Sequence, residues 1–123
     1  MNIRVKRVYE DYDVTDGVRV LVDRLWPRGL RKATSKVDIW MRDVAPSDGL
    51  RKWFSHDPKK WMRFKSKYRV ELKDNRELQK LVQLAVENGT VTLVFAALDQ
   101  RHNNAVALAE VLRRKAERAS KAG

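Results

Sequence analysis

Three short apolar runs have the composition of β-strands. Along residues 3–8 apolar side chains alternate imperfectly with charged ones, which predicts a strand with one solvated face. The second run covers about residues 18–25 and the third covers residues 90–97. Both contain consecutive apolar residues, so we expect these two strands to be buried on both faces, as central strands are.

A polar link joins the first two strands. It covers residues 10–17 and ends in Thr15-Asp16-Gly17, which is a turn signal. The link is shorter than the dozen or so residues that a helical crossover between parallel strands needs. We therefore predict an antiparallel hairpin between the first and second strands.

After the second strand the apolar positions switch to helical spacing. Ser35 with Asp38 three residues later is a variant of the capping box, which predicts a helix start. Pro46 ends this first helix, because the residue before a proline is disfavoured in the helical conformation. The apolar stripe of the helix is Val37, Trp40, Met41 and Val44.

Four further helices follow from their caps. Ser47 caps a short helix that ends at Phe54, and Asp57 followed by proline opens a long basic helix over residues 57–73. Another helix starts at Asp74 and ends at Asn88-Gly89. The last covers about residues 103–115, with Asp99 or an adjacent residue as its cap.

The element order is therefore β-β-α-α-α-α-β-α. Doubly buried strands joined by helices predict a single α/β domain with a small mixed or mostly parallel sheet. We expect about three strands, covered by four to five helices. The domain covers residues 1–116, and the basic tail at 117–123 is expected to fray.

Composition narrows the classes of protein and site. The chain of 123 residues has no cysteine, which excludes disulfides, thiolate metal sites and cysteine nucleophiles and fits a reducing cytoplasm. No apolar run suits a signal peptide or a membrane span, so we expect a cytoplasmic protein without membrane partners. Two histidines without cysteine give no metal-ligand spacing, and glycine-rich phosphate loops are absent. We expect no metal and no cofactor.

Charge changes the picture of the partners. The formal net charge is +11, with a pI near 10.3, which favours polyanions or phosphorylated small molecules over other ligands. A solvated basic surface without a partner is the alternative. The positive charge is concentrated in the helix at residues 57–73 and in the tail from Arg113. The aromatic residues of that helix lie on the stripe that the core needs, so any nucleic-acid binding there is expected to be nonspecific.

Candidate chemistry gathers where the second and third strands end. If these strands are parallel neighbours, the loops at 23–30 and 98–104 meet at one edge of the sheet, where α/β proteins place their sites. The start of the last helix would point there too and favour an anion. Asp23 and His102 are the candidate catalytic acid or base. The candidate ligand contacts are Arg24, Trp26, Arg28, Arg51, Asp99 and Asn103.

Each candidate has a structural alternative. Asp23 beside Arg24 fits a structural ion pair. Asn103 fits a helix cap, and Trp26 fits the core. His102 fits an ordinary surface position. The residues predict a site for a small anionic, phosphorylated ligand, with a nonspecific nucleic-acid binder as the alternative, and they leave open whether the site is catalytic.

The run Leu-Val-Asp-Arg-Leu-Trp-Pro-Arg-Gly at residues 21–29 resembles the signature of the YeaO-like family, which is known as domain of unknown function 488. The resemblance extends over nearly the whole chain. Its other parts are Trp40 with residues 43–47, residues 50–54 with 56–58, Trp61, Phe64 and Tyr68, and residues 91–97 with Asp99, His102, Asn103 and Ala105.

The resemblance implies an α/β domain and brings no established activity. Longer relatives have a cysteine-histidine-arginine motif in the loop after the last strand. Here the matching segment, residues 99–104, has no cysteine, so the chain resembles a short, cysteine-free branch in which thiol chemistry cannot operate. Some relatives are labelled transcriptional regulators, but this sequence has no DNA-reading motif.

Overall fold

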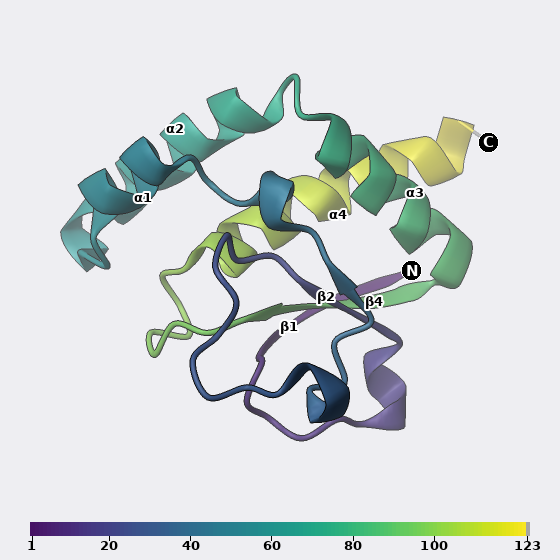
Figure 1. Cartoon of the computed structure of the whole chain (residues 1–123). Coiled ribbons are helices and arrows are strands. Elements are labelled where there is room, and N and C mark those ends of the chain that lie inside the picture. Colours follow the sequence, from purple (N-terminus) through teal and green to yellow (C-terminus); the bar gives the residue numbers. More distant parts are fainter. Residues whose placement is uncertain (123) are drawn as a thin grey trace.

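A four-stranded parallel sheet forms the centre of the computed structural model, which describes residues 1–122 (Figure 1). The strand order is β1-β4-β2-β3. The predicted single α/β domain is confirmed, with four strands rather than three. The strands are β1 (Asn2–Arg7), β2 (Val18–Leu21), β3 (Ile39–Trp40) and β4 (Thr90–Phe95).

The predicted antiparallel hairpin is wrong. The strands β1 and β2 are not neighbours, because β4 lies between them and is parallel to both, with Val91 opposite Ile3 on one side and Val18 on the other. Extended chain of the length of residues 8–17 spans roughly 35 Å, whereas a strand of six residues is about 20 Å long. The link can therefore return to the start of the sheet without a crossover helix, and it contains only the 3-10 turn Val14–Asp16.

The helix predicted from Ser35 is also wrong. Its central part is the edge strand β3, which pairs with β2 through Ile39 opposite Val20. Asp38 strengthens this pairing, because its carboxylate accepts the backbone N–H of Arg19 at 2.8 Å. Pairing with the open edge of β2 has overridden the helical spacing of the apolar residues. The rest of the segment forms the 3-10 turns Lys32–Thr34 and Arg42–Val44.

The other helices are confirmed, with small shifts at their ends. The side chain of Ser47 accepts the N–H of Leu50, as its predicted cap role requires. Asn75, rather than Asp74, caps the third helix, which ends at Gly89 with a positive φ of 79°. The helices are α1 (Asp48–Phe54), α2 (Trp61–Leu72, after the 3-10 turn Pro58–Lys60), α3 (Arg76–Asn88) and α4 (Asn104–Ala122).

The last helix is longer than predicted. It begins at Asn104 and continues to Ala122, through most of the segment expected to fray. The fraying of that segment stays a prediction, and Gly123 lies outside the described residues. The cap is not Asp99 or a residue adjacent to it, as predicted, but Asn103, whose side-chain oxygen accepts the N–H of Val106 at 3.0 Å, because the helix begins only at Asn104.

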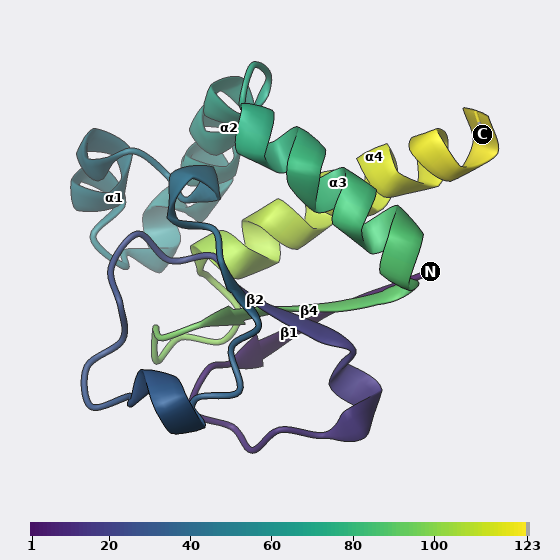
Figure 2. The same cartoon turned by 45° about the vertical axis from the view of Figure 1, so that its right-hand side comes forward.

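The two faces of the sheet are covered differently. All four α-helices lie on one face, and loops and 3-10 turns cover the other (Figures 1 and 2). The main core lies between helices and sheet and includes Val20, Leu93 and Leu108. On the helix-free face a small cluster of Val8, Leu21 and Val94 is extended by Trp26, Leu30, Val37, Trp40 and Ala96.

A buried ion cluster fastens the β1–β2 link to the helix-free face. Arg19 and Asp16 are fully buried, and the guanidinium lies 3.3 Å from the carboxylate. Lys6 on β1 contacts the same carboxylate at 3.0 Å. Burial is the largest single influence and would raise the pKa of Asp16, but the hydrogen bonds from Lys6 and the Asp13 backbone, with the charges of Lys6 and Arg19, together hold that pKa below its usual value. Gly17 is required beside this cluster, because a Cβ there would lie 2.3 Å from the Thr90 carbonyl oxygen.

Candidate functional site

The loops that follow β2 and β4 meet at the carboxyl edge of the sheet, because these strands are parallel neighbours. Asp23 joins them. Its carboxylate accepts the backbone N–H of Ala96 at 2.9 Å and the side-chain amide of Asn104 at 3.2 Å. Asn104 also donates to the Val22 carbonyl at 2.9 Å. Asp23 therefore ties the end of β2, the loop after β4 and the start of α4 together.

The environment of Asp23 favours its neutral form. Burial raises the pKa of its carboxyl group, and the hydrogen bonds from Ala96 and Asn104 and the charge of His56 offset this only in part. A carboxyl group of this kind can hold a proton at a higher pH than an exposed aspartate can. His56 therefore lies within electrostatic range of Asp23, although it comes from the turn after α1.

That turn has an unusual backbone. Ser55 and His56 have positive φ angles of 46° and 56°, and neither residue is a glycine. Two consecutive residues in the left-handed region are strained, and such strain is common at functional sites. The sequence assigned His56 to a turn and gave no reason to place it near Asp23. Its only signal was its place in the family resemblance.

His102 is oriented by Asp99. The imidazole Nδ1 lies 2.9 Å from the Asp99 carboxylate, which also accepts the backbone N–H groups of Arg101 and His102. Together these hydrogen bonds hold the pKa of Asp99 below its usual value, and the one from the Arg101 backbone contributes most. The imidazole packs edge-on against Trp61, with ring centroids 5.4 Å apart. Because Nδ1 faces Asp99, Nε2 is the nitrogen that can contact a ligand.

The ion pair of Arg24 with Asp23 that the sequence offered as an alternative is not formed within residues 1–122, and Arg24 bonds to other parts of the fold instead. Its guanidinium donates to the carbonyls of Ala45 and Pro46, both at 3.2 Å, and lies 3.9 Å from the Asp43 carboxylate. Arg7 at the same edge donates in the same way to the carbonyls of Ala96 and Ala97. Two cations near the edge therefore hold backbone carbonyls.

The other predicted ligand contacts lie in three different settings. The Trp26 indole donates to the Leu30 carbonyl at 2.7 Å and packs on Trp40 on the helix-free face, as a core residue would. Arg28 is exposed, and its backbone carbonyl accepts the hydroxyl of Tyr9. Arg51 on α1 pairs with Asp48 at 3.3 Å. None of these contacts is with the side chain of Asp23 or His102, although Trp40 donates to the backbone carbonyl of Asp23 at 2.8 Å.

Asn103 is a helix cap, which its structural alternative predicted. Its amide nitrogen also donates to the Asp99 carbonyl at 3.0 Å, so both of its polar atoms are bonded within the loop and helix start. The carboxyl edge thus joins Asp23 to Asn104, with His56 nearby, and places the pair of Asp99 and His102 beside Trp61. Among residues 1–122, no group of three His, Asp or Glu side chains could hold a metal ion.

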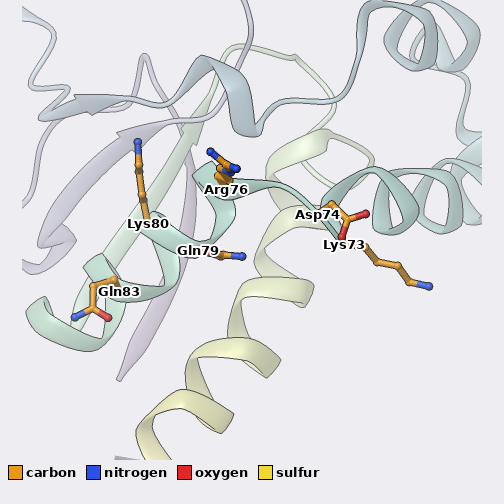
Figure 3. A pocket seen from close by; sticks show the side chains of 6 residues that line it. All are labelled: Lys73, Asp74, Arg76, Gln79, Lys80 and Gln83. Carbon is orange, nitrogen blue, oxygen red and sulfur yellow. The ribbon is translucent and has the colours of Figure 1, made fainter.

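A second candidate region lies where α2 turns into α3 and meets α4. A hollow of about 320 Å³ is bordered by the cations Lys73, Lys115 and Arg118. Its remaining lining residues are Leu72, Asn75, Leu78, Gln79 and Val82. A second, open hollow of about 530 Å³ continues over the outer side of α3, lined by Lys73, Asp74, Arg76, Gln79, Lys80 and Gln83 (Figure 3).

This region unites the two basic segments that the sequence set apart. The helix at residues 57–73 supplies Lys73, and the segment from Arg113 supplies Lys115 and Arg118. Among residues 1–122, Asp74 is the single carboxylate lining either hollow. Within residues 1–122, Lys73, Arg76, Lys115 and Arg118 form no ion pair, unlike Arg19, Arg51 or Lys80. No helix in this part of the chain is long and apolar enough to span a membrane.

Comparison with known proteins finds uncharacterized relatives. A profile described as the Inactive DUF488-N3 subclade matches residues 2–123. An uncharacterized protein of Mycobacterium tuberculosis, Rv3073c, is 46% identical over 110 residues, which is 89% of this chain and 92% of the relative. The uncharacterized protein YeaO of Escherichia coli is 37% identical over 113 residues, covering 92% of this chain and 98% of the relative. No solved structure matches.

Proposed function

The chain belongs to the YeaO-like DUF488 family, and from this premise we propose that it binds nucleic acid or a similar polyanion through the basic region at α2, α3 and α4. The matching subclade is described as inactive, which agrees with a binding role rather than a catalytic one. One observation carries the proposal: cations from separate helices border a common hollow and are not paired with carboxylates.

The charge of the chain supports this function. A net charge of +11 attracts polyanions over long distances, and unpaired lysine and arginine side chains release counterions when they contact phosphates. Lys73, Arg76, Lys115 and Arg118 can each contact a phosphate without first breaking an ion pair within residues 1–122. The affinity should therefore fall steeply with salt and depend little on sequence.

Fluorescence anisotropy with a labelled 20-base-pair duplex tests the proposal. We expect the double variant K115E/R118E to bind at least about ten-fold more weakly at low salt, with a salt slope smaller by about 2, because each lost phosphate contact reduces the slope by about 1. The matched control is R31E/K36E, which makes the same charge change in the loop on the helix-free face. If both variants weaken duplex binding equally, the affinity depends on net charge alone and the proposed site at the basic region is wrong.

A second function is favoured by the carboxyl edge. We propose that a small anionic, phosphorylated ligand binds there, because the half-buried Asp23 and His102 come from the loops at this edge and His56 is close enough to Asp23 to lower its pKa. Protonated imidazoles would hold the anion, and the N-terminus of α4 adds a favourable dipole. Of the predicted contacts, Arg28 and Arg51 are exposed and remain part of this proposal.

A thermal-shift screen with inorganic phosphate, sugar phosphates and nucleotides tests the edge site, because a ligand of the native state raises the melting temperature. We expect His102→Gln to remove the shift, and His56→Asn to weaken it, since asparagine tolerates the left-handed backbone there. K115E/R118E is the matched control. If that variant alone removes the shift, the ligand binds at the basic region instead.

A further inference from the structure

We infer that the hollow between the α2–α3 turn and α4 receives one unpaired nucleotide, so that the protein prefers single-stranded nucleic acid to duplex. The inference rests on the proposed polyanion binding and deepens it. It concerns the same cations but adds the apolar and amide groups that line the hollow between them.

The floor of the hollow is apolar. Leu72 and Leu78 expose only 1% and 2% of their surface, so the accessible apolar part of the floor comes mainly from Val82, which is half-buried against the core. A duplex offers no partner for such a floor, because its bases are stacked inside and its outer surface carries phosphates. An unpaired base exposes an apolar ring face that can lie on aliphatic side chains.

The rim of the hollow is cationic. Lys73 follows α2, and Lys115 and Arg118 extend from α4 on successive turns of one helix face. None of the described residues that line this hollow has a carboxylate, so a phosphate that enters meets no like charge from them. The arrangement suits a base on the floor with the phosphates on either side of it at the rim.

An amide lies beside the floor. Gln79 is exposed and lines both hollows, and Figure 3 shows its amide directed from α3 toward the turn that carries Lys73 and Asp74. Asn75 cannot act in the same way, because its amide oxygen caps α3 at Leu78 and its nitrogen donates to the Asp43 carbonyl. Gln79 has both a donor and an acceptor, which is what the edge of an unpaired base requires.

The size agrees with one nucleotide. A volume of about 320 Å³ lies at the lower end of the range of roughly 300 to 1,000 Å³ for small-molecule sites. The open hollow over α3 continues from it past Arg76, so the strand can leave the site along a cationic surface.

The test compares three labelled 12-mers of equal charge per strand at one salt concentration: a mixed-sequence single strand, a single strand of abasic sugar-phosphate, and the duplex of the first with its complement. We expect the base-bearing single strand to bind roughly ten-fold more tightly than the other two. Equal affinities would overturn the inference.

Two kinds of variant distinguish a failure of the nucleotide site from a failure of polyanion binding. Gln79→Ala and Val82→Thr should reduce the preference for the base-bearing strand while leaving duplex affinity within about two-fold, because neither changes charge. K115E/R118E should weaken the binding of all three oligonucleotides. If it does so while the three bind equally, the polyanion function stands and the nucleotide site is wrong. If it weakens none, the function itself is wrong.

Competition identifies the chemistry of the occupant. Vesicles of phosphatidylglycerol or a polyglutamate peptide that displaced the single strand more effectively than equal-charge abasic strand would contradict the inference, since neither presents a base. Far-ultraviolet circular dichroism and melting curves of each variant confirm that it is folded before its affinity is compared.

Discussion

The carboxyl edge of the sheet and the basic region at α2–α4 both contain clustered charges, but the two clusters differ in what they contact. At the edge, Asp23 accepts hydrogen bonds from Ala96 and Asn104, and Arg7 and Arg24 hold backbone carbonyls. At the basic region, Lys115 and Arg118 border a hollow and form no ion pair within residues 1–122. Charges at the edge mostly stabilise the fold, and those at the helices are available to a partner.

The largest effect should come from removing Asp23. Asp23→Ala leaves the N–H of Ala96 and one bond of Asn104 without a partner, which should lower the free energy of unfolding by about 2 kcal/mol. Urea denaturation measures it. If this variant is as stable as the wild type, the charges at the edge contribute no more to the free energy of unfolding than those of the basic region do.

Arg24→Ala should have the next largest effect. The side chain is three-quarters buried, and its guanidinium joins the β2 loop to the carbonyls of Ala45 and Pro46. Its loss should lower the free energy of unfolding by at least about 1 kcal/mol, because each of the two hydrogen bonds has a net worth of about 0.5 to 1.5 kcal/mol. The edge ligand screen should be unaffected. If the variant melts at the wild-type temperature but no longer shows the ligand-induced rise in melting temperature, Arg24 contacts the ligand and does not stabilise the fold.

The free energy of unfolding should depend on pH through Asp23 at the carboxyl edge. Burial raises the pKa of Asp23 above its unfolded value, so the native state binds more protons than the unfolded state between the two pKa values. This contribution to stability is complete below about pH 4, the pKa of an unfolded aspartate, and is lost as the pH rises through the native pKa. Asp23→Asn should remove that loss.

Urea denaturation at a series of pH values compares the two proteins. The wild type should lose stability relative to Asp23→Asn as the pH rises from about 4. Asp23→Glu is the control that keeps a titrating group. A difference that is constant with pH would show that the native Asp23 has an ordinary pKa, and the buried acid at the edge would lose its support.

The smallest effect on stability belongs to the basic region. Replacing Lys115 and Arg118 with alanine should change the free energy of unfolding by no more than about 0.5 kcal/mol, since both are exposed surface positions. The same variant should reduce the salt slope of duplex binding by about 2. A large loss of stability would show that these cations support the packing of α4 and are not free for a partner.

The sequence predicted that the loops after the two central strands meet at one edge of the sheet, because parallel neighbouring strands end there. Asp23 joins these loops through Ala96 and Asn104. Arg24 and Asn103 were predicted as ligand contacts, and both are bonded within the protein. Residue type and position alone do not reveal hydrogen-bond partners that lie some twenty residues away, as Ala45 and Pro46 do.

The errors in the fold have the same origin. The apolar residues from Val37 to Val44 fit a helix by their spacing, but backbone pairing of Ile39 with Val20 made the segment an edge strand. The short link after β1 was read as a hairpin, although β4 inserts between the two strands from the far end of the chain. The charge of His56, 33 positions along the chain, also reaches Asp23 and lowers its pKa, which no local pattern predicts.

The sequence by itself determined the strands β1, β2 and β4, the helices with their caps at Ser47 and Asn103, the lack of thiol chemistry, and the positive charge. These depend on local spacing, capping and composition, which neighbouring residues decide. The tertiary structure alone decided the strand order, the edge strand β3, the partners of Asp23, and the meeting of Lys73 with Lys115 and Arg118. Those features require contacts between residues far apart in the chain, and the burial of the core against one face of the sheet selects them.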